Sequence, residues 1–356
     1  MMRAWLTVIG LGSFVCGLAL AACGGTNAAI GGSDAGADGT ASSTDGGGDA
    51  GSSNDAAGDA SDAGSTTEAG LACAPPSNPG QSALCLLIVP ESMTFTSDPK
   101  FDGKGWLVAQ LFTTAQPNLP DGGSAPVLAM QELPPGGPDA GSIDLSQPLP
   151  VLRFDGLPST VYVRVVFVDD PAANPQVGAS TWLGGFDLSA GLLSSTPLVA
   201  HPLPVGEGTA LSIDLVALRE MIVTMNRSVA PAGNGEGPAT AVATPDQSPT
   251  SASPLFGEAT NACARVDGTN TAVVPGFVIG KGPYYVAGVV DDFGLDDGGL
   301  SLPPGALTSL EVDGGGFVLP AANLLTYDPK AYRVSQTITL NYVLPGAPAA
   351  DTVSCP

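Results

Sequence analysis

The sequence contains a single histidine, His201, and this scarcity restricts the chemistry open to the chain. A Ser-His-Asp or Cys-His mechanism would have to use it. His201 lies in the apolar run 198–203, without a Gly-x-Ser-x-Gly elbow nearby, and we interpret it as a histidine at a strand end. The sequence also lacks a His-Glu-x-x-His motif, a phosphate-binding loop and a dinucleotide fingerprint. We therefore predict that the protein is not an enzyme.

Basic residues are scarce as well. The chain has 11 Lys and Arg against 34 Asp and Glu, which gives a net charge of −23 at pH 7. Nucleic-acid phosphates require a basic surface patch, so the composition excludes nucleic acid as a partner. The same acidity disfavours direct binding to anionic lipid headgroups.

Aromatic residues make up only 6% of the chain. Trp106, Trp182, Tyr284 and Tyr285 could form a platform on which a carbohydrate stacks, or they could fill the core. The many carboxylates could also meet in space as the pair that a glycoside hydrolase needs. An extracellular polymer hydrolase, or an accessory subunit of one, therefore stays open as an alternative function.

With 48 Gly and 33 Pro, the sequence leaves little room for long helices. Short apolar runs separated by Gly-, Pro- and Asp-rich turns predict an all-β fold. The run 216–225 has a helical pattern but ends in β-branched residues, and both alternatives stay open there. Strands are expected at 84–89, 106–112, 127–130, 151–154, 161–168, 182–188, 198–201, 211–218, 271–274, 284–290, 316–319 and 336–344.

The N-terminal segment has the pattern of an export signal. After a positively charged start, residues 4–20 are apolar and uncharged, and residues 20–23 read Leu-Ala-Ala-Cys. This tetrapeptide resembles the lipobox of bacterial lipoproteins. The resemblance implies a signal peptide at 1–22, a lipid on Cys23 and, because Gly24 follows, an outer-membrane location facing the periplasm or the cell surface. A plain secretory signal and an uncleaved membrane helix are the alternatives, but a spanning helix needs about 20 apolar residues.

Residues 23–72 form a different kind of segment. They are mainly Gly, Ala, Ser, Thr and Asp, with no aromatic residue or proline, and every charge among them is acidic. Such a segment cannot bury enough apolar surface to offset its chain entropy. We predict a disordered, self-repelling tether. A calcium-binding β-roll is the alternative, although the regular spacing and the large apolar residue of its repeats are missing.

Four cysteines remain after the signal peptide and the lipidated residue: Cys73, Cys85, Cys263 and Cys355. An even number in an exported protein predicts two disulfides. Four cysteines allow three pairings, and we favour Cys73–Cys85 with Cys263–Cys355 because each closes a local unit. A four-thiolate zinc site is the alternative, but the close cysteine pairs that it requires are absent.

The composition changes again at 228–257, where Pro, Gly, Ala, Thr and Ser dominate. A loop of this length inside a compact domain is uncommon. We therefore predict a linker between a first domain at 73–227 and a second domain at 258–356.

The two domains look like a repeat. Residues 151–170 align without gaps on 273–292, which places Tyr162 on Tyr284. The stretch 284–292, Tyr-Tyr-Val-Ala-Gly-Val-Val-Asp-Asp, resembles a strand and turn of transthyretin-like or carboxypeptidase-regulatory-like sandwiches of exported bacterial proteins. The resemblance implies two Ig-like, transthyretin-like β-sandwich domains that serve binding, adhesion or accessory roles and carry no catalytic residues.

An acidic loop follows that strand. Asp291, Asp292, Asp296 and Asp297 lie within seven residues and precede Gly298-Gly299. Calcium takes six to eight oxygen ligands from carboxylates and carbonyls on a tight loop, so these residues are a candidate calcium site. The spacing departs from the EF-hand pattern, and a solvated hairpin turn that keeps a strand edge soluble is the alternative.

Together these features predict a lipid-anchored exported protein with a non-enzymatic binding or structural role at the cell envelope. Apart from calcium, no cofactor is expected. The partners would be the membrane, through the lipid, and a protein or carbohydrate ligand that the sequence does not identify. The polymer hydrolase and a calcium-dependent adhesion module are the alternative functions.

Overall fold

The computed structural model describes residues 72–116, 125–169, 181–191, 197–250, 253–266, 271–280, 282–293, 304–313 and 316–346, together with 352 and 355. The expected signal peptide at 1–22, Cys23 and all of the expected tether except Ala72 lie outside these residues, as do Asp296 and Asp297. No helix within the described ranges has the length and apolar character needed to cross a bilayer.

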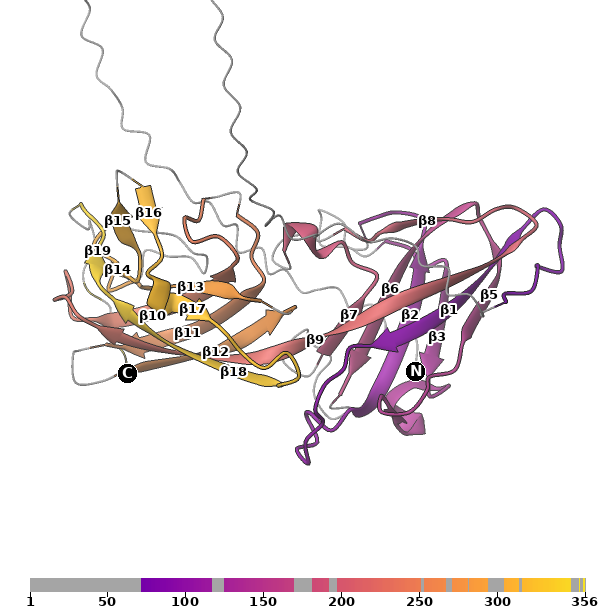
Figure 1. Ribbon diagram of the computed structural model, residues 1–356, viewed down its shortest axis with the longest axis horizontal. Coiled ribbons are helices and arrows are strands. Elements are labelled where there is room, and N and C mark those ends of the chain that lie inside the picture. Colours follow the sequence, from indigo (N-terminus) through magenta and orange to yellow (C-terminus); the bar gives the residue numbers. More distant parts are fainter. Residues whose placement is uncertain are drawn as a thin grey trace, which may run out of the picture.

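Nearly every regular element is a strand, which confirms the all-β prediction (Figure 1). The run 216–225 is a strand too. The first half contains β1 (Ser82–Pro90), β2 (Lys104–Phe112), β3 (Ala129–Leu133), β4 (Ile143–Asp144), β5 (Leu152–Leu157), β6 (Thr160–Val168), β7 (Thr181–Gly184) and β8 (Ala200–Pro202). The second half contains β10 (Glu236–Thr244), β11 (Gly257–Arg265), β12 (Ala272–Ile279), β13 (Tyr284–Val290), β14 (Leu307–Thr308), β15 (Glu311–Asp313), β16 (Gly316–Val318), β17 (Leu324–Leu325), β18 (Arg333–Leu340) and β19 (Tyr342–Val343). Short 3₁₀ turns are η2 (Gly137–Ala140), η3 (Leu188–Ala190) and η4 (Ala321–Asn323).

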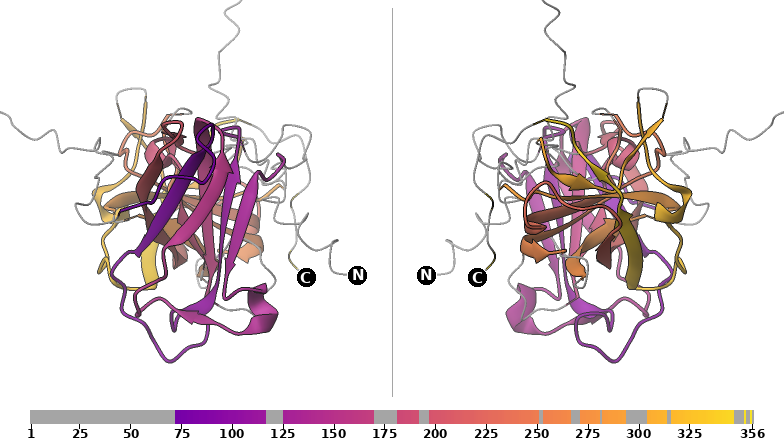
Figure 2. Two further views of the ribbon diagram at one scale, coloured as in Figure 1. Left: turned by 90° about the vertical axis from the view of Figure 1, so that its right-hand side faces the viewer. Right: turned by 90° about the vertical axis from the view of Figure 1, so that its left-hand side faces the viewer.

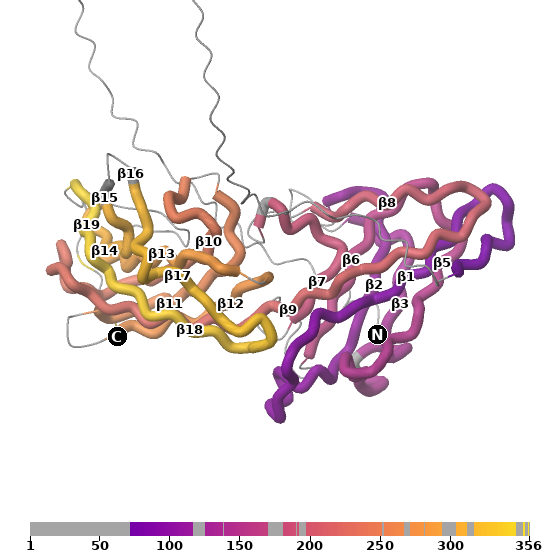
Figure 3. Tube along the Cα trace, viewed as in Figure 1, coloured from indigo at the N-terminus to yellow at the C-terminus, as the bar shows by residue number. Residues whose placement is uncertain are grey.

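One long strand, β9 (Gly208–Arg227), belongs to both halves. Its first part pairs in parallel with β1, from Ala83 against Gly208 to Pro90 against Leu215. Its last part pairs with β12 on one side and, in parallel, with β18 on the other. The tube in Figure 3 follows β9 without a break from one half into the other. The two halves are therefore joined by continuous strand backbone rather than by a loop.

The segment 228–257, which we expected to be a linker, contains a strand of the second sheet. β10 lies within it and pairs with β11 on one side and β13 on the other. The prediction of a linker there is wrong because β10 reads Glu-Gly-Pro-Ala-Thr-Ala-Val-Ala-Thr, and small residues with low strand propensity gave no strand signal. Tertiary packing decides the outcome, since Ala239, Ala241 and Ala243 are buried in the second core.

The two halves do repeat one strand arrangement. In the first half β1 pairs with β5 and, in parallel, with β9, while β2 pairs with β3 and β6. In the second half β9 takes the place of β1 and pairs with β12 and, in parallel, with β18, while β10 pairs with β11 and β13. The suspected repeat is thus present in the topology, with β9 serving as the last strand of one half and the first of the other.

The gapless alignment was nevertheless wrong by one residue. Phe112 on β2 lies opposite Tyr162, whereas Thr244 on β10, in the corresponding place, lies opposite Tyr285. Tyr162 therefore corresponds to Tyr285 and not to Tyr284. A one-residue slip turns every side chain to the other face of a strand, and Tyr284 is accordingly buried while Tyr162 and Tyr285 are only partly covered.

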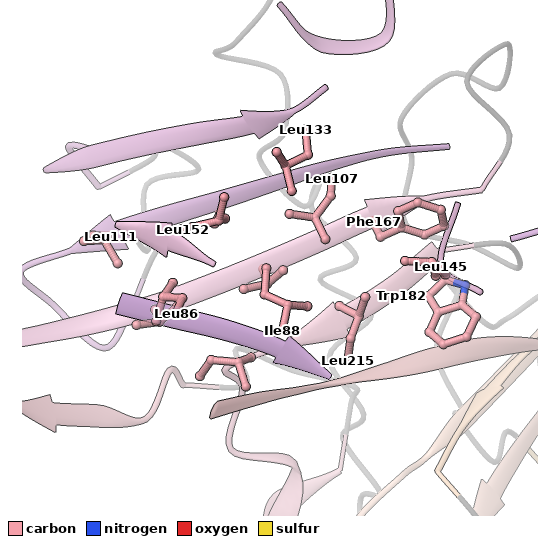
Figure 4. Packing of buried hydrophobic residues seen from close by; sticks show 14 of the residues in the cluster. Leu86, Ile88, Leu107, Leu111, Leu133, Leu145, Leu152, Phe167, Trp182 and Leu215 are labelled. Carbon is pink, nitrogen blue, oxygen red and sulfur yellow. The ribbon is translucent and has the colours of Figure 1, made fainter. Parts of the chain in front are cut away.

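Each half surrounds its own apolar core, and the end-on views of Figure 2 show the strands that enclose it. Figure 4 shows part of the first core, where leucines from neighbouring strands meet beside Trp182 and Phe167. A third cluster lies between the halves: Trp106, Val108, Val166 and Leu183 of the first half pack with Ile279 and with Phe256 and Phe277 of the second. Burying these side chains stabilises the joint, at about 25 cal/mol per Å² of apolar surface removed from water.

Candidate functional site

The structure offers His201 no catalytic partner within the described residues. It sits on the short strand β8, opposite Val161 of β6, and its Nε2 atom is buried without a hydrogen bond. Burial lowers the pKa of its imidazole, so the ring is neutral near pH 7. His201 lies in a strand, as expected, but it is the middle residue of β8 rather than a residue at the strand end.

The aromatic platform does not form. Trp106, Trp182 and Tyr284 are buried, and their rings pack in the apolar clusters. Tyr284 stacks on Phe256 with ring centroids 5.1 Å apart and donates its hydroxyl hydrogen to the carbonyl of Ile279. Of the four candidate residues only Tyr285 is partly exposed, which is too little for a stacking surface.

Both expected disulfides are present. Cys73 is bonded to Cys85 and Cys263 to Cys355, with Cα atoms 5.7 Å and 5.6 Å apart. The first disulfide ties the start of the body to β1, and the second ties the chain near its C-terminus to β11. The predicted pairing is confirmed, and a four-cysteine zinc site is excluded because all four thiols are used.

Asp291 and Asp292, the part of the acidic loop that the structure describes, are buried rather than solvated. Asp291 accepts a hydrogen bond from the amide of Phe293, and Asp292 accepts one from the amide of Gly233 at 3.0 Å. The alternative of a solvated turn is therefore wrong for these two residues. Asp296 and Asp297 lie outside the described residues, so the calcium site stays a prediction.

Asp292 belongs to a constellation that both halves contain. In the second half Asn234-Gly235-Glu236-Gly237 leads into β10, and the amide of Gly235 donates to the Asp292 carboxylate. In the first half Asp102-Gly103-Lys104-Gly105 leads into β2, and the amide of Gly103 donates to the carboxylate of Asp169. The same turn thus holds one buried carboxyl group at the end of β6 and of β13.

Glycine is required at two places in each turn. Gly103 and Gly235 have φ values of 74° and 75°, in the left-handed region that other residues avoid. A Cβ atom on Gly105 would lie 1.8 Å from the carbonyl oxygen of Val168, and one on Gly237 would lie 1.9 Å from that of Asp291. The backbones therefore approach each other too closely for any side chain.

The carboxyl groups of Asp169 and Asp292 both have a raised pKa. Burial, the largest cause, raises the pKa of both, and for Asp169 the neighbouring Asp102 adds to the shift and brings the pKa to about 8. In each group one oxygen, Oδ1, is buried without a hydrogen bond. Asp169 is therefore mostly protonated at neutral pH, and it acts as part of the fold rather than as a free charge.

Tyr332 connects this constellation to the second half of the molecule. It lies just before β18 but is buried in the first core, where its ring packs near Phe101 and Trp182. Its hydroxyl donates to Oδ2 of Asp169 at 3.4 Å. The second half thus inserts an aromatic side chain into the core of the first.

Arg219 is the second polar connection between the halves. It lies at the midpoint of β9, is fully buried, and forms an ion pair with Glu91, which follows β1. Its guanidinium also donates to the carbonyl oxygens of Gly280, at 2.9 Å, and Pro329, at 2.7 Å, both in the second half. The ring of Tyr327 lies 5.6 Å from the guanidinium carbon. One side chain therefore ties three separate segments at the joint.

The sequence analysis missed the buried Arg219 and the two glycine turns around Asp169 and Asp292, although the sequence carried a signal for each. Arg219 is a cation in the middle of the apolar run 215–225, where a charge is retained only if it has partners. The two turns share the pattern Asx-Gly-x-Gly at 102–105 and 234–237, which would have placed β10 and the repeat register correctly.

Comparisons with known proteins give no family. No family model matches the chain. No curated protein matches it either.

Among solved structures, the chain is similar to a candidate polysaccharide-binding protein from Bacteroides thetaiotaomicron, with 9% identity, 72% of this chain and 90% of that chain covered, and a TM-score of 0.25. A candidate adhesin from the same organism has 10% identity, coverage of 80% and 95%, and a TM-score of 0.26. The fimbrial anchor protein Mfa2 from Porphyromonas gingivalis has 7% identity, coverage of 58% and 77%, and a TM-score of 0.23.

Proposed function

We propose that the chain is a lipid-anchored exported protein with a non-enzymatic binding or structural role at the cell envelope. The observation that supports this role is the joint between the halves. A continuous strand, a buried ion pair and an apolar cluster all cross it, so the two sandwiches form one elongated, stiff body. A loop between independent domains would instead leave their relative motion free.

This construction suits a body that holds a surface at a fixed distance from a membrane. The lipid on Cys23 would attach the chain, and the acidic segment 23–72 would extend by self-repulsion and carry the body away from the headgroups. Two disulfides fit an oxidising compartment outside the cytoplasm. The ligand would be a protein or a carbohydrate bound on the surface of the body.

The anchor is tested by membrane fractionation and detergent-phase partitioning of the Cys23→Ser variant. We expect the variant to leave the membrane fraction, because its side chain can no longer carry the thioether-linked lipid. Cys16→Ser is the matched control, since this residue lies inside the proposed signal peptide and its replacement should change nothing. A Cys23→Ser protein that still partitions with lipid would show that the segment is a spanning helix and that the anchor proposal is wrong.

A further inference from the structure

The first half has an open seam where the second half is closed. In the second half β11 and β12 pair directly, with Gly257 opposite Val278 and Ala259 opposite Gly276. The corresponding strands of the first half are β3 and β5. Among the described residues β3 pairs only with β2, and β5 pairs only with β1. Two strand edges therefore face each other without a ladder of hydrogen bonds between them.

A side chain crosses this seam in place of backbone. The amide group of Gln131 on β3 donates a hydrogen bond to the carbonyl oxygen of Arg153 on β5. The side chain of Gln131 therefore lies where backbone hydrogen bonds would otherwise join the two strand edges. The Gln131 amide resembles a peptide group chemically, and it satisfies an acceptor that a neighbouring strand would otherwise satisfy.

Apolar side chains are exposed at the same place. Eight large hydrophobic residues of the described chain are exposed, and four of them flank the seam: Val127, Leu128, Met130 and Val151, with 37% to 43% of their surface accessible. β3 itself has no lysine, no proline and no bulge, and Glu132 is its one charged residue. An unpaired edge with exposed apolar residues is the feature that strand-adding partners use.

The sequence of β3 defines the chemistry of the occupant. Leu128, Met130 and Glu132 alternate with residues that face the core side, so they lie on one face of the strand. Cross-strand neighbours prefer apolar against apolar and opposite charges against each other. A matching strand would carry two apolar residues and one basic residue on that face. The net charge of −23 disfavours a second copy of this chain, which would repel itself.

We propose that the seam between β3 and β5 binds an extended segment of another protein, with alternating apolar side chains and a basic residue opposite Glu132. The segment adds as a strand and displaces the Gln131 amide from Arg153. Pro126 and Pro134 limit the added strand to about seven residues, because proline cannot continue a ladder. This inference rests on the proposed binding role and names the class of partner, a protein.

The test uses the full chain in detergent and a fluorescent heptapeptide, Thr-Lys-Thr-Val-Thr-Leu-Thr, whose binding is followed by anisotropy. We expect saturable binding, protection of the β3 amides from hydrogen exchange, and no binding of Thr-Lys-Thr-Pro-Thr-Leu-Thr. Glu132→Lys should weaken binding about three- to tenfold and strengthen binding of the peptide with Glu in place of Lys. Met130→Glu should abolish binding, while Val273→Glu, at an exposed position on β12 of the closed half, should leave it unchanged.

The inference would be overturned if the heptapeptide did not bind, or if the proline peptide bound as well as it does. Equal weakening of binding by Val273→Glu and Met130→Glu would overturn it too. The outcome of this test is distinguishable from the outcome of the lipid-anchor test. A peptide that fails to bind a chain whose Cys23→Ser variant leaves the membrane refutes the docking inference alone. Peptide binding by a chain whose Cys23→Ser variant stays in the membrane refutes the anchor alone.

Discussion

Replacing Asp169 by asparagine should make the stability of the protein less dependent on pH. Asp169 is fully buried, and burial together with Asp102 raises its pKa to about 8, against about 3.9 in an unfolded chain. The folded state therefore binds more protons than the unfolded state between these two values. By linkage, the free energy of unfolding decreases as pH rises through that window, and the stabilising proton is fully lost only above pH 8.

The size of the effect follows from the two pKa values. Each unit of pKa difference corresponds to about 1.4 kcal/mol, so the ceiling for a shift of this size is about 5.6 kcal/mol. Between pH 5 and pH 8 we expect the wild-type protein to lose on the order of 2–4 kcal/mol through this group. Asparagine has nearly the same shape, stays neutral, and can accept the hydrogen bonds from Tyr332 and Gly103. Asp169→Asn should therefore match the wild type within about 1 kcal/mol at pH 5.

The measurement is urea unfolding of both proteins at pH 5, 6, 7 and 8, with the exposed Asp246→Asn as the control. The slope of stability against pH should fall by more than half in Asp169→Asn and stay unchanged in Asp246→Asn. Some slope should remain, because the pKa of Asp292 is raised by burial as well. A wild-type protein that gains stability from pH 5 to pH 8, or an Asp169→Asn variant with the full wild-type slope, would refute the reasoning.

Three further results are expected. Arg219→Met should cost about 3–5 kcal/mol in urea unfolding, because Glu91 and two carbonyl groups lose their buried partner, and a cost below 1 kcal/mol would contradict the role of this residue in the joint. Replacing both Cys263 and Cys355 by alanine should cost about 4.6 kcal/mol, against about 3 kcal/mol for Cys73 and Cys85, because the two disulfides span 92 and 12 residues. Equal losses in urea unfolding would count against loop length as the cause. For the proposed calcium site, millimolar calcium should raise Tm, and Asp291→Asn combined with Asp297→Asn should remove the rise; a melting curve unmoved by calcium or chelator would leave the loop as a polar turn.

Several of the expected strands follow from local pattern alone. β2, β6 and β13 are mainly apolar runs bounded by turn residues, and the structure places strands there. The favoured pairing of the cysteines, one of the three that the sequence allows, is confirmed. The strands depend on short-range chemistry, which the sequence displays directly.

β10 and β11 escaped prediction for a physical reason. Their inward-facing positions hold alanines, such as Ala241, Ala243 and Ala259, whose burial depends on close packing with strands far away in the sequence. The burial of Asp291 and Asp292 was missed for a related reason. Two aspartates after a strand give no sign that a glycine turn distant in the sequence will bury them and donate hydrogen bonds to one of them. Both errors concern long-range contacts.

The sequence by itself determined the β class, the presence of two disulfides, the place of His201 in a strand and the expectation of export, because each of these depends on composition, on the number of cysteines or on neighbouring residues. Only the tertiary structure decided that β9 is shared by both halves, that Arg219 and Tyr332 tie the halves together, and that the seam between β3 and β5 is open while that between β11 and β12 is closed. The reason is that strand partners are chosen by the global fit of cores and edges, and periodicity along one strand does not encode its neighbour.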